Sequence, residues 1–501
     1  QPATGHEHVL LEGGRFRQSY QELRQEAARI ANGLSAAGVT AGAPVVLQVA
    51  DRPGLIATMW GCIAAGVTPV ILACPRSYRD GDRIALQLVH ALEQFASPTL
   101  VTRAATAPTL DALVRGALQR TVAIHALEEL ATHSPHTELH AARPRDLAML
   151  LHTSGTTGIP TLVPITHRQI LSGALAHAEA SGLERGSPSL NWLALTHVSN
   201  LSRSIRDVYL AADQLHVATE LVAQHPLRLL DLLADHRIHS LFTPAFGLRM
   251  LIAAAQGDTT RRDLSQLRSI LSSGEPHAAR PLVEVAALLA RHGATDVVHV
   301  GYGLTESSST ITVGRLREAS VRGLVDSGAP VRGASIRVVD GHGELVPVGE
   351  LGHIELAGPM IVDYPATIDG WLRTGDLGFL TDGRLTVVDR EKDIVIVNAV
   401  NYPTREIESF AESATELARA IACNVRLPDE DVERVLVFAV APRAPADFVG
   451  IAHAVRTTLR RTLGLDAVVV VLPPGSLPEA DKVSRSSLRS RYLAGELEVT
   501  T

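Results

Sequence analysis

Hydrophobic and polar positions follow two different rhythms along roughly the first 330 residues. Between residues 20 and 37, apolar side chains recur at helical spacing from Leu23 to Leu34, which predicts an amphipathic helix. Short apolar runs between such segments predict strands, at residues 45–47, 99–101, 192–195, 215–217, 240–242, 270–271 and 297–300. Strands that alternate with helices form mostly parallel sheets covered by helices, so we expect an α/β fold.

The pattern changes near Gly333. Short strands alternate there with turns such as Asp340-Gly341 and predict a small antiparallel β-region, with strands at residues 335–339, 352–356 and 385–388. The last segment mixes both kinds of element, with strands predicted at 394–397, 435–440 and 468–471 and helices at 404–411 and 448–463. We therefore predict a large N-terminal domain (1–389, with its β-region at about 333–389) and a smaller α+β C-terminal domain (390–501).

The composition predicts a sizeable core and narrows the choice of partners. Hydrophobic residues make up 46% and charged residues 20% of the chain, which is typical of a folded protein. The net charge is −7 and no basic tract stands out, so we expect no nucleic-acid partner. The stretch between Arg52 and Arg76 is uncharged, but Gly66 and Pro69 interrupt it. We expect a buried helix and a buried strand there, and no membrane span.

The three cysteines, Cys62, Cys74 and Cys423, are widely spaced and lie in apolar runs. No two of them have the spacing of a metal knuckle, and we expect buried thiols in a reducing, cytoplasmic compartment. No secretory apolar region follows Gln1, and a chain that starts at this residue can be an excised piece of a longer protein.

A hydroxyl- and glycine-rich hexapeptide follows the apolar run at residues 147–151 and consists of Thr153, Ser154, Gly155, Thr156, Thr157 and Gly158. Glycines let the backbone approach a ligand closely, while N–H groups and hydroxyls bind anions, so the segment is a candidate polyphosphate cradle. The alternative is an ordinary Ser/Thr/Gly turn. Because Thr166-His167 opens a helical pattern, we expect a strand–loop–helix unit. No Lys follows the glycines, so the segment is not a P-loop.

Four later motifs are also candidates for chemistry, although each alone also fits a cap, a turn or a solvated charged face. Glu306 follows a predicted strand, at the edge where ligand clefts form in α/β folds. Asp376 precedes a strand and offers an acceptor for ribose hydroxyls. The motifs read Tyr302-Gly303-Leu304-Thr305-Glu306, Arg373-Thr374-Gly375-Asp376, Asp389-Arg390-Glu391-Lys392-Asp393 and Lys482-Val483-Ser484-Arg485 with Leu488-Arg489.

In this order and spacing, the motifs resemble those of the acyl- and aryl-adenylating enzymes over essentially the whole chain. This superfamily includes acyl-CoA synthetases, fatty acyl-AMP ligases, luciferases and the adenylation domains of nonribosomal peptide synthetases. The resemblance implies ATP-dependent activation of a carboxylic acid as acyl-AMP, with Mg²⁺ and release of pyrophosphate. A thiol would then attack the acyl-AMP after the mobile C-terminal domain has rotated.

The resemblance also implies roles for individual residues. The hexapeptide, residues 153–158, would wrap the β- and γ-phosphates of ATP. Thr305 would contact the α-phosphate and Glu306 would hold Mg²⁺, while Asp376, helped by Arg390, would accept hydrogen bonds from the ribose. The adenine would lie against Gly274, Glu275, Pro276, Tyr302 and Gly303.

Two lysines and a pocket complete the implied site. Lys392 lies at the position of the interdomain hinge, and Lys482 aligns with the lysine that bridges the carboxylate and the α-phosphate. His197 would lie at the mouth of the acyl pocket, whose predicted lining is His197, Asn200, Phe242, Ala245 and Phe246.

The acid itself is only partly indicated. Residues 195–201 and 242–248 contain no Asp that would bind an α-ammonium group, which favours a non-amino acid, and Asn200 with nearby Arg203 leaves a polar acid open. The local sequence at residues 191–197, 206–209 and 390–402 is similar to that of fatty acyl-AMP ligase-like starter domains of polyketide and nonribosomal peptide assembly lines.

Several positions depart from the family pattern. Thr161-Leu162 replaces the usual Lys-Gly, Ala399 replaces a glycine, and the segment before Lys482 is two residues shorter than usual. The loop at 361–370 is also short. Three interpretations therefore stay open. In the first, which we favour, the attacking thiol belongs to an acyl or peptidyl carrier protein. In the second, the thiol belongs to free CoA. In the third, the chain is a weakened nucleotide-binding homologue with an assembly role.

Overall fold

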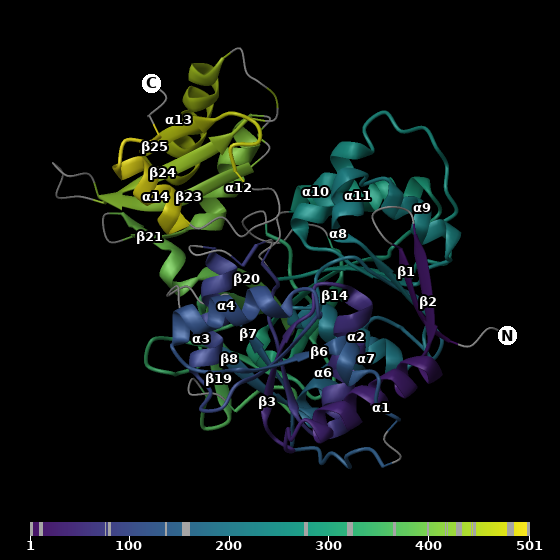
Figure 1. The fold of residues 1–501 in the computed structure, drawn as a ribbon. Helices are drawn as coiled ribbons and strands as arrows, with labels where there is room; N and C mark the ends of the chain where they lie inside the picture. Colours follow the sequence, from purple (N-terminus) through teal and green to yellow (C-terminus); the bar gives the residue numbers. More distant parts are fainter. Residues whose placement is uncertain are drawn as a thin grey trace.

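The computed structural model places helices and strands in the alternating order expected from the sequence (Figure 1). It describes residues 4–9, 14–75, 77–78, 82–135, 138–152, 161–274, 279–317, 324–363, 367–397, 400–415, 417, 419–426, 433–441, 443, 447–477 and 485–497.

A six-stranded sheet with the order β6-β5-β3-β4-β7-β8 forms the first layer. All its neighbours pair in parallel except β7 and β8, which are antiparallel. The strands are β3 (Pro44–Gln48), β4 (Thr68–Ile71), β5 (Thr99–Thr102), β6 (Ala123–Ala126), β7 (Leu147–His152) and β8 (Leu162–Thr166). The helices are α1 (Tyr20–Ala36), α2 (Arg52–Ala65), α3 (Arg83–Glu93), α4 (Ala107–Leu118) and α5 (Leu127–Leu130).

These elements confirm the buried helix and strand expected for the uncharged stretch. Helix α2 begins after Asp51, whose side chain accepts a hydrogen bond from the Gly54 N–H, and ends at Gly66 in the left-handed conformation. All four residues of β4 are buried. Within the described part of the chain, no helix has both the length and the hydrophobicity needed to span a bilayer.

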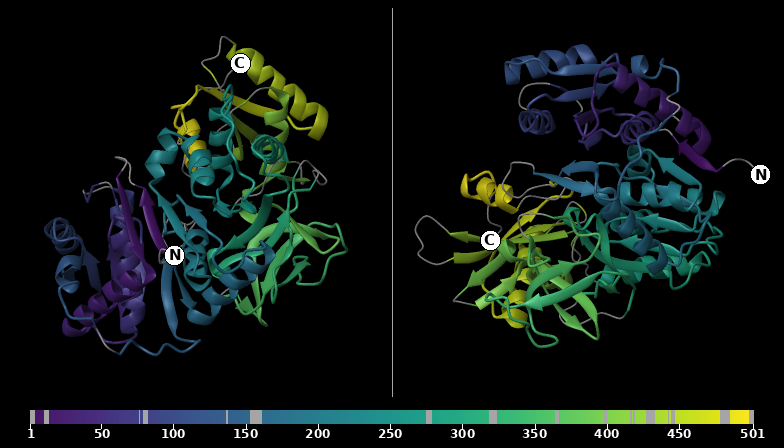
Figure 2. Two further views of the ribbon diagram at one scale, coloured as in Figure 1. Left: turned by 90° about the vertical axis from the view of Figure 1, so that its right-hand side faces the viewer. Right: turned by 90° about the horizontal axis from the view of Figure 1, so that it is seen from below.

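A nine-stranded sheet with the order β15-β14-β13-β12-β11-β9-β10-β1-β2 lies beside the first (Figure 2). Its inner strands are parallel and its edge pairs are antiparallel. The strands are β1 (Gly5–Val9), β2 (Arg15–Ser19), β9 (Ser189–Asn191), β10 (Gln214–Val217), β11 (Ser240–Phe242), β12 (Ser269–Ser272), β13 (Val298–Leu304), β14 (Ser309–Arg315) and β15 (Ala329–Pro330). The helices are α6 (His167–Ala180), α7 (Val198–Tyr209), α8 (Thr219–Gln224), α9 (Arg228–Asp235), α10 (Ala245–Ala254), α11 (Ala279–Arg291) and the 3₁₀ turn η1 (Thr305–Ser307).

The strand predicted at residues 192–195 is wrong. The strand that pairs with β10 and β11 is instead β9, and the chain leaves the sheet after Asn191. The guanidinium of Arg52 donates to the carbonyl groups of residues 191–193 and satisfies them in place of a neighbouring strand. The apolar run is therefore a buried connection, with the Trp192 indole N–H donating to the Phe242 carbonyl.

The β-region is antiparallel, as predicted, but its sheet has five strands where three were expected. These are β16 (Ser335–Val339), β17 (Gly352–Ala357), β18 (Thr367–Ile368), β19 (Trp371–Thr381) and β20 (Arg384–Arg390). Asp382 and Gly383 both have positive φ and form the two-residue turn between β19 and β20.

The last segment packs around cores of its own (Figure 1, yellow-green). A sheet with the order β23-β24-β25 is covered by α12 and α13, and β21 pairs with β22. The elements are η3 (Glu391–Asp393), β21 (Ile394–Val397), β22 (Val400–Pro403), α12 (Thr404–Ala414), β23 (Arg419–Arg426), β24 (Glu433–Val440), α13 (Phe448–Leu463), β25 (Ala467–Leu472) and α14 (Arg485–Leu493).

Candidate active site

Two predicted site residues that are far apart in sequence are joined by a short hydrogen bond. The hydroxyl of Tyr302, near the end of β13, donates to Oδ2 of Asp376 on β19 at 2.6 Å. The expectation that Asp376 precedes a strand is wrong, because β19 already begins at Trp371 and Asp376 pairs with Arg390 of β20. Tyr302 and Asp376 are both buried. Burial, and next the charge of Asp376, raise the pKa of the Tyr302 hydroxyl, which therefore stays a protonated donor. The contact joins the nine-stranded sheet to the antiparallel sheet.

Arg390 and Glu306 lie near the same carboxylate. Arg390 pairs with Asp376 across β19 and β20, and its Nε lies 3.4 Å from Oδ1 of Asp376. Burial raises the pKa of the Glu306 carboxyl, the positive charge of Arg390 opposes this rise, and the charge of Asp376 adds to it. Two acidic groups and one half-exposed guanidinium therefore share one polar site.

The chain turns sharply to bring Thr305 and Glu306 to this edge. β13 carries a register shift between Tyr302 and Gly303, and a Cβ on Gly303 would lie 2.4 Å from the Ser309 carbonyl oxygen, so only glycine fits. The 3₁₀ turn η1 follows, and its Glu306 carbonyl accepts from the Val362 N–H at 2.8 Å. This edge holds the carboxyl ends of the parallel strands, where ligands bind in open α/β sheets.

Other predicted nucleotide contacts lie partly outside the described residues. Gly274 follows β12, the parallel neighbour of β13, and its φ of 98° favours glycine. Glu275, Pro276, Lys482 and the six residues 153–158 lie outside the described residues, as does the side chain of Lys392.

The structure does describe what flanks two of these segments. β7 and β8 pair around residues 153–160, so the expected strand–loop–helix is a β-hairpin followed by α6. α14 begins at Arg485, three positions beyond Lys482, and Arg485 contacts Glu408 and Asp393.

Two of the predicted acid-pocket residues, Phe242 and Phe246, contact Trp192. Phe242 ends β11, Ala245 begins α10, and the Phe246 ring meets the Trp192 ring edge-on at 5.7 Å. His197 is the N-cap residue of α7, and Asn200 on the first turn donates from its amide to the Ala194 carbonyl. Sequence reasoning missed Trp192 as the residue that holds both phenylalanines, because its run was read as a strand.

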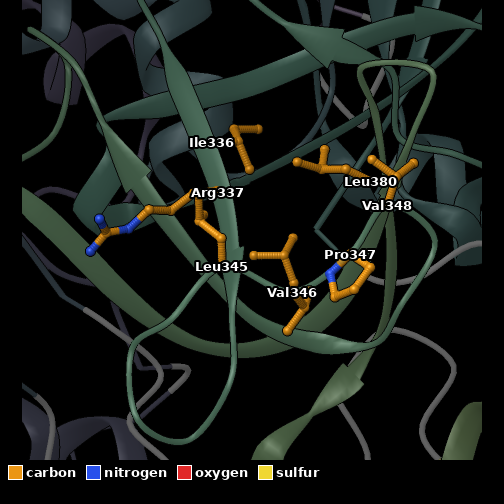
Figure 3. A pocket seen from close by; sticks show the side chains of 8 residues that line it. Ile336, Arg337, Leu345, Val346, Pro347, Val348 and Leu380 are labelled. Carbon is orange, nitrogen blue, oxygen red and sulfur yellow. The ribbon is translucent and has the colours of Figure 1, made fainter.

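A shallow apolar groove lies elsewhere, between β16, β19 and the hairpin that follows β16 (Figure 3). Leu345 and Val348 line it, while Arg337 points away and bonds Glu355 beside the Trp371 ring. Among the predicted site residues that the structure describes, none lines this groove.

Comparisons with known proteins identify the family of this chain. The family model described as AMP-binding enzyme matches residues 1–363. The nonribosomal peptide synthetase pngA of Aspergillus terreus is 30% identical over 95% of this chain and 53% of its own length. The chain thus spans about half the length of the curated relatives it matches.

Solved structures share the fold. The structure of McyG A-PCP complexed with phenylalanyl-adenylate is 27% identical, covering 98% of this chain and 81% of that one, with a TM-score of 0.89. The adenylation domain of a keto acid-selecting NRPS module, bound to keto acyl adenylate, is 25% identical and covers 94% of both chains with a TM-score of 0.76. The chain therefore belongs to the family of AMP-binding enzymes, the adenylate-forming ligases and synthetases.

Proposed function

We propose that the protein activates a carboxylic acid with ATP and Mg²⁺, releases pyrophosphate, and passes the acyl group to the phosphopantetheine thiol of a carrier protein in natural-product biosynthesis. The observation that carries this proposal is the convergence of Tyr302, Asp376, Arg390 and Glu306. Tyr302 and Arg390 are 88 positions apart in the sequence, and the four side chains come from three separate segments of the chain. A bound nucleotide would account for a cluster of this composition at the carboxyl edge of the sheet.

The residues fit the parts of ATP by their chemistry. Asp376 accepts hydrogen bonds from the ribose hydroxyls, the Tyr302 ring packs against adenine beside Gly303, and Gly274, Glu275 and Pro276 form the rest of the adenine site. Thr305 contacts the α-phosphate and residues 153–158 hold the β- and γ-phosphates. Glu306 holds Mg²⁺, which in nucleotide sites needs only one or two carboxylates beside the phosphates.

Lys482 neutralises charge during the first step. A carboxylate is repelled by a triphosphate, so a cation must lie between them while the carboxylate oxygen attacks the α-phosphorus. Lys392 acts as the hinge about which residues 390–501 rotate before thiol transfer. Of the 46 basic residues in the chain, only Lys392 and Lys482 are lysines. Because lysine and arginine are not interchangeable, this supports the functional roles proposed for both lysines.

The acid enters past His197 into the pocket of Asn200, Phe242, Ala245 and Phe246. The absence of Asp from the two pocket segments favours an acid without an α-amino group. A keto acid is the substrate type named for one related adenylation domain. A carrier protein is favoured over free CoA because the McyG structure pairs an adenylation domain with a PCP.

Pyrophosphate release with ATP, Mg²⁺ and a panel of aryl, aliphatic, keto, polar and amino acids tests the proposal. Each acid is assayed alone, with CoA, and with a phosphopantetheinylated carrier protein. We expect acid-dependent release and acylation of the carrier, with no acceleration by CoA. Acyl-CoA formation would instead assign the protein to the CoA ligases.

Thr161 motivates a second candidate, a weakened homologue that binds nucleotide without turnover. Thr161→Lys restores a cation beside the departing phosphates, so we expect an unchanged or higher rate of pyrophosphate release from an active enzyme. If ATP binds to the wild type but every acid gives no release, and Thr161→Lys restores it, the weakened homologue is the better description.

A further inference from the structure

A buried cation lies beside the acid pocket. Arg203, on α7 one turn after Asn200, is 3% exposed. Its Cζ lies 4.1 Å from the centroid of the Phe242 ring, a cation–π contact with one of the proposed pocket residues. Its Nη1 donates to the Ser199 carbonyl at 2.6 Å. The guanidinium is therefore fixed against the pocket wall rather than extended into solvent.

The charges around Arg203 do not balance in the described part of the chain. The neighbouring Arg206 binds Oδ1 of Asp207 through Nε and Nη2, and Oδ2 of Asp207 accepts from Ser189. His177 lies between the two guanidinium groups, and burial with both their charges lowers its pKa, so it stays neutral. One buried carboxylate thus serves two buried guanidinium groups, and it is fully engaged by Arg206 and Ser189.

One edge of the Arg203 guanidinium has donor capacity that the described residues do not use. Among the described residues, its buried Nε has no hydrogen-bond partner, and its Nη2 has the 3.5 Å contact with Nε2 of His177. The Nε and Nη2 donors of a guanidinium are parallel and match the two oxygens of a carboxylate. An unpaired buried charge is strongly unfavourable, so its retention points to a counter-charge that arrives with the substrate.

The neighbouring wall is also polar. The Ser202 and Ser309 hydroxyls lie 3.3 Å apart, linking α7 to β14, and the next residue, Thr310, has a buried hydroxyl with no partner among the described residues. A pocket that binds a plain alkyl or aryl chain does not need these buried hydroxyl groups.

We propose that Arg203 determines the specificity of this pocket, and that the activated acid carries a second carboxylate, which accepts paired hydrogen bonds from Nε and Nη2 of Arg203. The proposal rests on the adenylation proposed above and names its substrate class as dicarboxylic acids. The same cation disfavours an α-ammonium group, in agreement with the absence of a pocket Asp.

Matched pairs of acids test the proposal in the wild-type enzyme. Succinate, glutarate and adipate are compared with butyrate, pentanoate and hexanoate, each pair having equal carbon number, by kcat/KM for pyrophosphate release. We expect the dicarboxylate of the best-fitting pair to exceed its partner by about tenfold or more. A wild type that prefers the monocarboxylates, or does not discriminate, overturns the inference but leaves the adenylation function standing.

The variant Arg203→Met keeps a long apolar side chain on Phe242 and removes the charge. We expect it to lower kcat/KM for the dicarboxylate about tenfold or more and to leave the monocarboxylate unchanged or improved, while Arg203→Lys retains part of the preference. Arg268→Met, at a half-exposed surface arginine, serves as the control. An equal loss for both acids of a pair would mean that Arg203 has a structural role or holds the reacting carboxylate, and the inference fails. If no acid gave pyrophosphate release with the wild type, the proposed adenylation itself would be refuted.

Discussion

At the scale of single residues, the site depends on how burial acts on a few polar side chains. Burial raises the pKa of the Glu306 carboxyl, Arg390 partly offsets this rise, and the charge of Asp376 adds to it. Such a cluster is unfavourable in a protein without a ligand, and cations or hydroxyls of a ligand relieve it.

Glu306 gives a prediction that depends on pH. Because its pKa is raised, protons compete with Mg²⁺ at a higher pH than for an ordinary glutamate. We expect the Mg²⁺ concentration for half-maximal rate to rise as pH falls from about 8 to about 6. Glu306→Gln should lower kcat/KM about 10²-fold and abolish this pH dependence. If the variant kept the wild-type rate, the metal would have to be held elsewhere.

Asp376 gives a prediction about ATP affinity. Asp376→Asn keeps the size of the side chain but removes the charged acceptor for Tyr302 and for the proposed ribose hydroxyls. Hydrogen bonds to a charged group contribute about 1.5–3 kcal/mol, so we expect KM for ATP to rise at least about tenfold with a smaller change in kcat. Asp382→Asn, in the exposed β19–β20 turn, is the control; equal effects of the two variants would contradict the assignment.

At the scale of elements, the junction between β20 and α12 holds a buried carboxylate. Asp389, at the end of β20, accepts from the Thr404 hydroxyl at 2.6 Å and from the Arg405 N–H at 3.3 Å. Burial raises the pKa of Asp389, and the Thr404 bond opposes the rise. The first turn of α12 is thereby tied to the antiparallel sheet.

Thr404→Val removes that hydroxyl with little change in shape. We expect the free energy of unfolding to fall by about 1–3 kcal/mol at neutral pH, because a buried carboxylate loses a donor. The loss should shrink as pH falls through the raised pKa of Asp389, since the neutral carboxyl no longer needs that donor. Urea unfolding at neutral pH and at a pH below the pKa of Asp389 measures the loss of unfolding free energy. Thr462→Val, on the exposed face of α13, is the control. A loss that does not depend on pH would contradict the role of Asp389.

At the scale of the whole molecule, the proposed cycle needs residues 390–501 in two positions. Lys482→Ala should lower acyl-AMP formation about 10²-fold or more and spare thiol transfer from preformed acyl-AMP, because the lysine acts only in the first position. The two half-reactions are measured separately. Arg461→Ala, which removes an exposed charge from α13, is the control. Equal loss in both half-reactions would remove the basis for a two-position cycle.

The order of elements and the main motifs could be predicted from local sequence. The alternation of apolar runs with helical periodicity, the antiparallel β-region and the bounds of α2 depend on residues close to one another in the chain, and the structure agrees with them. The strand expected at 192–195 failed because its carbonyl groups bond Arg52, a residue about 140 positions away that no local pattern reveals.

The sequence by itself thus determined the α/β class and the family motifs, because these are encoded in short segments, and the nucleotide contacts proposed above rest on the same motifs. Only the tertiary structure decided that Tyr302 meets Asp376, that Trp192 holds Phe242 and Phe246, and that Arg203 lies buried with more positive than negative charge around it. Burial and charge balance are sums over residues distant in the chain, so no local pattern contains them.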